Sequence, residues 1–200
     1  MPSRMICRQV QSQRATSRGG GRVMGAGYAA PMANQPSSQS TRHSVTVERQ
    51  RLRFAAGHFA TFADELEPIH GHNYDVFVEV VGPLTDESWV IDFSLLKRLT
   101  REVCETLDHK FLLQMDSRAL TITDDDTHYL IQYQDELSYR LPKHDVAALP
   151  IDNSTAERLS QYIAGQLIES LQLSGPQGLA RLRVGVEEMP GQAAWFETDL

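Results

Sequence analysis

The chain has 200 residues, with 19 Lys and Arg against 26 Asp and Glu, and a formal net charge of −7. Residues 1–42 hold six Arg and no acidic residue, so residues 43–200 hold the other 13 basic residues and all 26 acidic ones. This acidic balance argues against binding to nucleic acid, which requires a basic surface. No apolar run is long enough to cross a membrane, so we expect no membrane partner.

Residues 1–42 differ from the rest of the chain in composition. They are rich in Ser, Gln, Gly and Ala and show no sustained apolar period, which predicts a disordered tail. An Arg-rich segment without acids is also compatible with a transit peptide, and a start at Met24 or Met32 is a further alternative. Two cysteines, Cys7 and Cys104, cannot build a disulfide framework, which fits a reducing compartment. We therefore expect a cytoplasmic protein.

Residues 43–200 are expected to form one domain that begins with two strands. Residues 44–58 and 72–81 have the β-branched content and alternation of strands, with FADELEP in the loop between them, which predicts an antiparallel pair. Residues 92–107 have apolar residues at helical spacing, with Asp92 as a candidate N-cap. The helical stripe consists of Phe93, Leu96, Leu99, Val103 and Leu107.

The second half of the domain is expected to contain a hairpin, a helix and a closing strand. Residues 127–142 predict the hairpin, with its turn at residues 135 and 136. Residues 155–172 predict the helix, because STAE at residues 154–157 has the form of a capping box. Residues 179–188 alternate again and predict the closing strand.

Three apolar strand faces end in ionisable residues. Side chains two residues apart share a face of a strand, so apolar stripes lead to His58, to His70 and His72, and to Glu188. An uncompensated imidazole or carboxylate at the end of a buried stripe costs roughly several kcal/mol. We therefore expect a bound ion or ligand where these stripes end.

The HGH motif and His58 together predict a metal site. His70 and His72 are side by side on one strand face, and His58 would complete a trio. Three nitrogen ligands with an open position are typical of catalytic zinc. The alternative is a pair of surface or hydrogen-bonded histidines. The His-x-His site of double-stranded β-helix metalloproteins is a poor match, because it needs a glutamate where Val76 and Phe77 stand.

Several motifs together carry a family resemblance. They are FAAGH, HGHNY, VIDFSLLK, LDHKFL, NSTAERL and VGVEE, and the resemblance extends over nearly all of residues 44–190. Their order and spacing are similar to those of the 6-pyruvoyl-tetrahydropterin synthase and 6-carboxy-tetrahydropterin synthase family. The resemblance implies the tunnelling fold, an α+β fold with a four-stranded antiparallel sheet and two helices on one face. It also implies homo-oligomers, in which trimers stack into hexamers and the site lies between subunits.

The resemblance implies roles for the metal ligands and for an acid/base pair. His58, His70 and His72 would hold Zn²⁺, which binds the oxygens of the pterin side chain and makes neighbouring protons easier to remove. Asp108 and His109 of LDHK would form the relay, with the carboxylate orienting the imidazole. The alternative for LDHK is a helix C-terminus stabilised by a cationic histidine.

Two further residues resemble the family's substrate contacts. Glu188 would anchor the pterin by accepting two parallel N–H bonds from its 2-amino and ring N–H edge. The alternative is an acid at the surface end of a strand. Thr155 resembles a threonine that contacts the pterin, but it also belongs to the capping box and could serve only to start the helix.

The chain departs from the family at its catalytic cysteine. That cysteine stands four or six residues before the first histidine of HGH, where this chain has Leu66 and Asp64. A variant subfamily uses a glutamate four residues before that histidine to cleave dihydroneopterin. Glu65 and Glu67 flank that position and serve only if the loop shifts by one residue; their alternative is a solvated acidic loop. Cys104 lies in a helical pattern and is interpreted as a small buried hydrophobe.

The main hypothesis is a zinc-dependent pterin lyase acting on 7,8-dihydroneopterin or its triphosphate. The missing cysteine favours cleavage to 6-hydroxymethyl-dihydropterin over formation of pyruvoyl-tetrahydropterin. The alternatives are a pterin-binding protein that has lost the lyase step and a structural zinc protein. Lys97, Lys110 and Arg53 are the candidates for binding the triphosphate, although they are not clustered in the sequence.

Overall fold

A computed structural model describes residues 41–48, 52–63 and 65–200. These residues belong to a compact unit that spans 39–200. The prediction of a disordered tail, the cysteine at position 7 and the aspartate at position 64 lie outside the described residues. Among the described helices, none combines the length and the apolar character that a membrane span requires.

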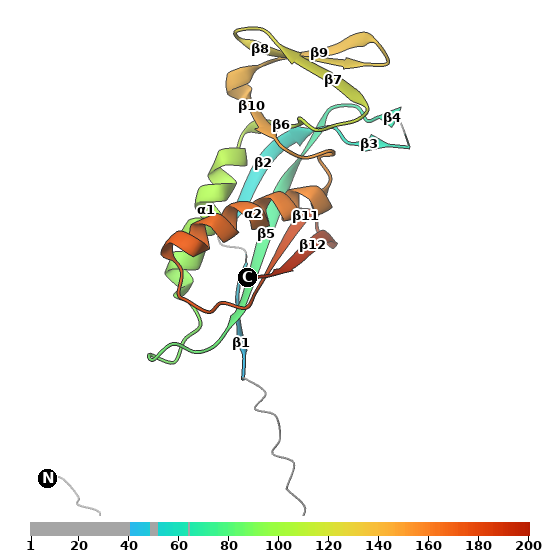
Figure 1. Ribbon diagram of the computed structural model, residues 1–200. Coiled ribbons are helices and arrows are strands. Elements are labelled where there is room, and N and C mark those ends of the chain that lie inside the picture. The colour runs from blue at the N-terminus through green and yellow to red at the C-terminus, as the bar shows by residue number, and fades with distance from the viewer. Residues whose placement is uncertain (1–40, 49–51, 64) are drawn as a thin grey trace, which may run out of the picture. The chain divides into compact units, whose positions relative to one another are not determined.

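The main sheet consists of an antiparallel part and a parallel edge (Figure 1). Its strands are β1 (His43–Val47), β2 (Arg53–His58), β5 (His70–Gly82), β6 (Lys110–Gln114), β10 (Val146–Leu149), β11 (Arg181–Met189) and β12 (Gln192–Asp199). The order is β10-β6-β2-β5-β11-β12, and β1 pairs with the far end of β5.

The predicted fold class is confirmed, and the sheet is larger than expected. β2, β5, β11 and β12 form the antiparallel part, while β6 and β10 add two parallel pairings at the edge beside β2. The single strand predicted over residues 44–58 is two strands, β1 and β2, which both pair with β5. The closing strand, β11, is followed by β12, which sequence analysis did not predict.

Two helices cover one face of the sheet (Figure 1). Helices α1 (Phe93–Leu107) and α2 (Ala156–Ser174) share one apolar cluster with the inward side chains of β2, β5 and β11. Four of the five residues predicted for the α1 stripe are buried, and Phe93 is exposed. Burial of each large apolar side chain contributes roughly 1.5–3 kcal/mol, so the packed stripes hold both helices to the sheet.

The two helix starts differ in their agreement with prediction. Asp92 caps α1 as expected, because its carboxylate accepts a hydrogen bond from the Ser94 amide at 2.9 Å. The N-cap of α2 is Thr155, and the first residue of the predicted capping box, Ser154, lies one position earlier. The Ser154 hydroxyl instead donates to the Phe59 carbonyl at 2.6 Å, so it is engaged away from the helix.

The short strands β3 (Thr61–Phe62) and β4 (Glu65–Leu66) pair with each other at one end of the main sheet. A separate three-stranded sheet lies at the same end (Figure 1). It consists of β7 (Leu120–Asp124), β8 (His128–Tyr133) and β9 (Glu136–Pro142). The predicted hairpin is confirmed as β8–β9. Its turn falls at Gln134 and Asp135, one residue earlier than expected, and both have positive φ, at 51° and 64°. A 3₁₀ turn, η1 (Lys143–Asp145), leads on to β10.

Strand register brings the histidines together at one end of the main sheet. His58 of β2 is paired with His70 of β5, and Ala56 is paired with His72. Between these pairs Gly57 is opposite Gly71. A Cβ atom on Gly71 would lie 2.9 Å from the Ala56 carbonyl oxygen, so the strands approach this closely only because position 71 has no side chain.

We predict that Gly71→Ala destabilises the protein and that Gly165→Ala does not. The added methyl group at position 71 meets backbone that cannot rotate away, which should lower the free energy of unfolding by about 1–3 kcal/mol. Gly165 lies inside α2 with nothing within 4 Å of a built Cβ, so alanine there should raise stability by about 0.5–1 kcal/mol. Urea denaturation of both variants measures the difference, and equal stability would contradict the close approach of β2 and β5.

Candidate metal centre and pocket

Three histidines converge where β2 and β5 end beside each other. His58, His70 and His72 each offer a ring nitrogen, and these atoms all lie within 4.8 Å of one another. His58 is buried, at 2 % exposure, His72 is half-buried and His70 is exposed. The trio predicted from the sequence is therefore present, with one ligand at the base of the cluster and one open to solvent.

Backbone carbonyls determine which ring nitrogens point at the centre of the cluster. The Nδ1 of His58 lies 2.9 Å from the Ser154 carbonyl oxygen, and the Nδ1 of His70 lies 2.9 Å from the Pro68 carbonyl oxygen. A carbonyl can only accept, so each Nδ1 carries the proton and each neutral ring has its lone pair on Nε2.

The two Nε2 atoms of His58 and His70 face each other at 3.1 Å. With both Nδ1 positions protonated, two lone pairs meet across this gap, an arrangement that is unfavourable unless a cation lies between them. A metal ion bound by imidazole nitrogen at roughly 2.0–2.1 Å is such a cation. The donor set of three imidazoles therefore fits zinc or another imidazole-binding metal.

The pKa of His58 favours the ligating form. Burial lowers it from 6.5 to about 4, against the opposing effect of the hydrogen bond to the Ser154 carbonyl. Desolvation disfavours the imidazolium, so the ring is neutral at neutral pH. A neutral imidazole is the form that binds a metal ion.

The histidines form part of the wall of a pocket of ≈ 540 Å³. Glu67, Thr155 and Glu188 line the same pocket, so three of the predicted site residues lie with the metal trio. Burial raises the pKa of Glu188, and the nearby His72 partly offsets that rise. A recessed carboxylate opposite three imidazoles can accept N–H donors from a polar heterocycle.

Thr155 caps a helix and also lies in the pocket wall. Its hydroxyl accepts from the Arg158 amide at 3.5 Å as the N-cap of α2, and the residue lines the pocket. Sequence analysis missed other residues of the pocket wall. They are Ala60, Thr61, Phe62, Asn153, Ala156, Glu157, Gln192, Ala193 and Ala194. Most of them follow β2 or start β12, where no apolar stripe marks them.

The two candidate glutamates have different surroundings. Glu67 lines the pocket, its Oε2 lies 3.4 Å from the Ala60 amide, and its own amide donates to the Ala60 carbonyl at 3.0 Å. Glu65 is exposed on β4 and does not line the pocket. Leu66, at the position of the family's cysteine, packs against the apolar cluster beneath β7–β9. Of the two candidate glutamates of this loop, Glu67 is therefore the one that places a carboxylate in the pocket.

Asp108 and His109 form a close pair outside this pocket. The Asp108 Oδ2 lies 2.8 Å from the His109 Nδ1, and its Oδ1 accepts from the Ala55 amide at 2.8 Å. These hydrogen bonds, with that to the Ala55 amide foremost, lower the pKa of Asp108. The His109 amide donates to the Ala55 carbonyl at 2.7 Å, and its φ of 56° turns the chain sharply from α1 into β6.

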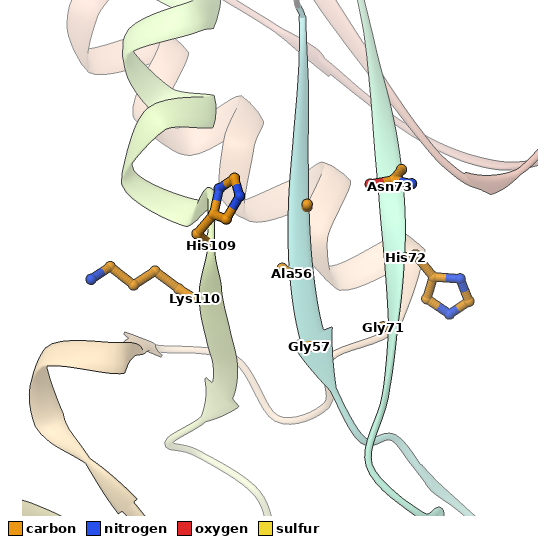
Figure 2. A pocket seen from close by; sticks show the side chains of 8 residues that line it. Ala56, Gly57, Gly71, His72, Asn73, His109 and Lys110 are labelled. Carbon is orange, nitrogen blue, oxygen red and sulfur yellow. The ribbon is translucent and has the colours of Figure 1, made fainter.

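The pair lies on the other side of the sheet from the metal trio. His109 borders a hollow with Gly57, Gly71 and Asn73, which alternate with the histidines and so face the opposite way. His72 also borders this hollow. Figure 2 shows His109 beside β2, while His72 points away from it beyond β5. The imidazole of His109 is 84 % exposed, so within one chain the pair does not reach the metal trio.

The remaining sequence candidates do not line the histidine pocket. Cys104 is 1 % exposed in the core, and burial raises the pKa of its thiol to about 12, as expected for a buried hydrophobe. Arg53 pairs with Asp75 at 3.1 Å, and Lys110 donates to the His144 carbonyl. Lys97 is half-buried on α1. None of these cations lines the pocket, so they do not form a phosphate cradle there.

Comparison with known proteins identifies similar chains over nearly all of the described unit. Residues 46–199 match the family model of 6-pyruvoyl tetrahydropterin synthase. A putative 6-carboxy-5,6,7,8-tetrahydropterin synthase of Methanocaldococcus jannaschii is 32% identical over 146 residues, covering 72% of this chain and 89% of that relative.

Solved structures give the same result. The 6-pyruvoyl tetrahydropterin synthase of Plasmodium vivax is 34% identical, with a TM-score of 0.76, covering 80% of this chain and 99% of that one. Another structure of the P. vivax protein, with a TM-score of 0.75 and the same identity and coverage, is a catalytic residue mutant in which a glutamate is replaced with alanine.

Proposed function

Because the chain belongs to the 6-pyruvoyl tetrahydropterin synthase family, we propose that it is a zinc-dependent lyase acting on 7,8-dihydroneopterin or its triphosphate. The observation that carries the proposal is the pair of Nε2 lone pairs of His58 and His70, facing each other at 3.1 Å in a pocket that also contains Glu67 and Glu188. A metal ligand set and these carboxylates in one pocket support metal-assisted proton transfer.

His58, His70 and His72 are the residues that would hold the ion. A zinc ion there would supply Lewis-acid polarisation of the substrate's side-chain oxygens. The carbonyls of Ser154 and Pro68 hold the His58 and His70 rings with Nε2 toward the ion. Such outer hydrogen bonds fix the tautomer and raise the basicity of the ligand.

Glu188 and Thr155 are proposed to bind the pterin ring. Glu188 would accept the 2-amino and ring N–H donors as a bidentate acceptor. It lies near the end of β11, where it follows the apolar pair of Val186 with Val76 on the same strand face. Thr155 lines the same pocket at the start of α2 and would contact the ring from that side.

Glu67 is proposed as the base that replaces the missing cysteine. It is the one of the two candidate glutamates that lines the pocket, and its loop is tied to Ala60 by a backbone hydrogen bond of 3.0 Å. A glutamate is also the residue replaced in the catalytic mutant of the P. vivax relative. The carboxylate would take a proton from a hydroxyl of the substrate's side chain.

This base is suited to carbon–carbon cleavage. Loss of a proton from the second side-chain hydroxyl lets the bond between the first and second side-chain carbons break. The two-carbon fragment leaves as an aldehyde, and the electron pair remains on the first carbon, where the pterin ring delocalises it. Protonation of that carbon gives 6-hydroxymethyl-dihydropterin. The step requires one base and one acid, for which Glu67 and His109 are proposed.

His109 would reach the pocket from a neighbouring copy of the chain. Within one chain Asp108 and His109 are on the other side of the sheet from the metal trio, yet the pair is preorganised by the 2.8 Å bonds to each other and to Ala55. The open edges β10 and β12 provide backbone for assembly. We therefore propose a homo-oligomer, as a hexamer of two trimers, with sites between copies.

The first prediction for this function concerns the metal. The purified protein should contain one Zn²⁺ per chain, and His70→Ala and His72→Ala should each lose most of it because three ligands are needed to hold the ion. His144→Ala, which changes an imidazole 80 % exposed on η1, is the matched control and should retain full zinc. Metal analysis by mass spectrometry measures this, and undiminished zinc in both cluster variants would exclude the site.

The second prediction concerns the reaction. The zinc-loaded protein should convert dihydroneopterin to 6-hydroxymethyl-dihydropterin faster than it forms pyruvoyl-tetrahydropterin from the triphosphate. Glu67→Gln should lower kcat by about 10²–10⁴-fold, the usual contribution of a general base. Identification of products by mass after separate incubations measures both reactions.

Two variants control for position in the loop. Glu65→Gln removes an equal charge outside the pocket and should leave cleavage unchanged. Leu66→Cys should not create pyruvoyl synthase activity, because position 66 packs against the apolar cluster under β7–β9. A predominant pyruvoyl product from the unmodified protein, or cleavage undiminished in Glu67→Gln, would refute the role of Glu67. Zinc and pterin binding without turnover would indicate a binding protein.

The third prediction tests whether the site spans two copies. His70→Ala lacks a metal ligand and His109→Ala lacks the relay, so each should be inactive alone. Co-assembled in equal amounts they should recover about a quarter of wild-type activity, because random pairing joins an intact metal site to an intact relay in one site of four. No recovery in verified mixed oligomers, or a stable monomer by light scattering at micromolar concentration, would contradict the shared site.

A further inference from the structure

A buried polar network adjoins His58 of the metal trio. Gln114, at the end of β6, and Ser154, just before α2, are both 0 % exposed. The Ser154 amide donates to the Gln114 side-chain oxygen at 3.1 Å. The carbonyl of the same serine accepts from the His58 Nδ1 at 2.9 Å. Gln114 is therefore linked to a metal ligand through the backbone of one residue.

The other bonds of the network hold the same segment against the end of β2. The Ser154 hydroxyl donates to the Phe59 carbonyl at 2.6 Å. Asn153 binds both backbone groups of Thr61, accepting from its amide at 3.0 Å and donating to its carbonyl at 2.8 Å. Segment 153–154 is thus attached to residues 59–61 by three hydrogen bonds. Gln114 binds the same segment through the Ser154 amide.

We propose that Gln114 is a positioning residue for the metal centre, which holds the backbone of Ser154 so that its carbonyl selects the His58 tautomer with Nε2 toward the ion. The Ser154 amide and carbonyl belong to the two successive peptide planes that meet at its Cα, and the hydroxyl bond to Phe59 holds the same residue, so fixing the amide restricts where the carbonyl can point. Gln114 does not line the pocket. Its effect on His58 passes through Asn153 and Ser154, to which the two ends of its amide bond.

The environment of Gln114 shows why an amide is needed there. Its neighbours Leu112, Leu113 and Leu149 are fully buried, and an amide in such surroundings is unfavourable unless it is hydrogen-bonded. Its nitrogen lies 3.4 Å from the Asn153 Oδ1, so both ends of the amide are used within the network. A low local dielectric strengthens these bonds, so the network makes one orientation of the Ser154 carbonyl strongly preferred.

The inference depends on the proposed function in one respect only, which is that the bound ion is zinc. The tautomer of His58 is a property of the metal-free protein as well, because its Nδ1 bond to Ser154 needs no metal. Two readouts therefore separate the hypotheses. Zinc affinity tests the whole proposal, whereas the His58 tautomer in metal-free protein tests the positioning role even if the protein binds no zinc.

The experiment compares Gln114→Met with Thr100→Val. Methionine has nearly the same shape as glutamine but cannot accept from the Ser154 amide. Thr100 is also 0 % exposed and donates to the Leu96 carbonyl at 2.8 Å within α1, so valine there removes a buried hydrogen bond remote from the site. Zinc affinity is measured by competition with a chromophoric chelator, and the His58 tautomer by ¹⁵N NMR of the metal-free protein.

Gln114→Met should bind zinc about 10–100-fold more weakly, as is typical when an outer hydrogen bond of a ligand is lost, and its His58 should show a mixture of tautomers. Thr100→Val should keep wild-type affinity and a single tautomer. If Gln114→Met does not fold, Gln114→Glu keeps an acceptor oxygen for the Ser154 amide and should lose less affinity than Gln114→Leu. Wild-type affinity and a single tautomer in folded Gln114→Met, or equal losses in Gln114→Glu and Gln114→Leu, would overturn the proposal.

Discussion

The hydrogen bond from the His58 Nδ1 to the Ser154 carbonyl is the constraint on which the site depends. It fixes the tautomer of a buried imidazole and so directs a lone pair at His70, whose own Nδ1 is bound to the Pro68 carbonyl. Burial lowers the pKa of His58 to about 4, so the Nε2 lone pair of this ring stays available near neutral pH. The contacts thus bring imidazole nitrogens together in an arrangement that fits a metal ion.

The sheet supplies this constraint through its register. The antiparallel pairing of β2 with β5 places His58 opposite His70, and the pairing of β5 with β11 carries Glu188 to the same end. The helices cover the face from which these side chains project. Along each strand, the apolar residues of the core are therefore followed on the same face by the polar residues of the site. The free energy gained by packing the stripes holds the polar ends in place, since a one-residue slip would turn every side chain to the other face.

Sequence analysis predicted the site residues that follow the alternation of side chains along a strand. It missed the residues whose role depends on backbone contacts between segments far apart in the chain. Alternation along strands was enough to group His58, His70, His72 and Glu188 on one face, because that rule needs no knowledge of loops. The parallel strands β6 and β10 were missed, since short apolar runs such as FLL do not reveal their partners. Gln114 and Asn153 were missed because they bind amides and carbonyls, which every residue has. The capping box also placed the start of α2 one residue early, because Ser154 has a stronger partner in the Phe59 carbonyl.

In the proposed function, Asp108 and His109 and the metal trio would act in one reaction, although the two groups are positioned separately. Both the relay and the metal trio are anchored to β2, the relay through the backbone of Ala55 and the trio through the side chain of His58. The side chains of His109 and His72 point away from each other (Figure 2). Each group is held by short hydrogen bonds within one chain. A second copy that presents its relay to the open side of the trio would join the two groups without deforming either one, and burial between copies would then provide the low dielectric that proton transfer beside a cation requires.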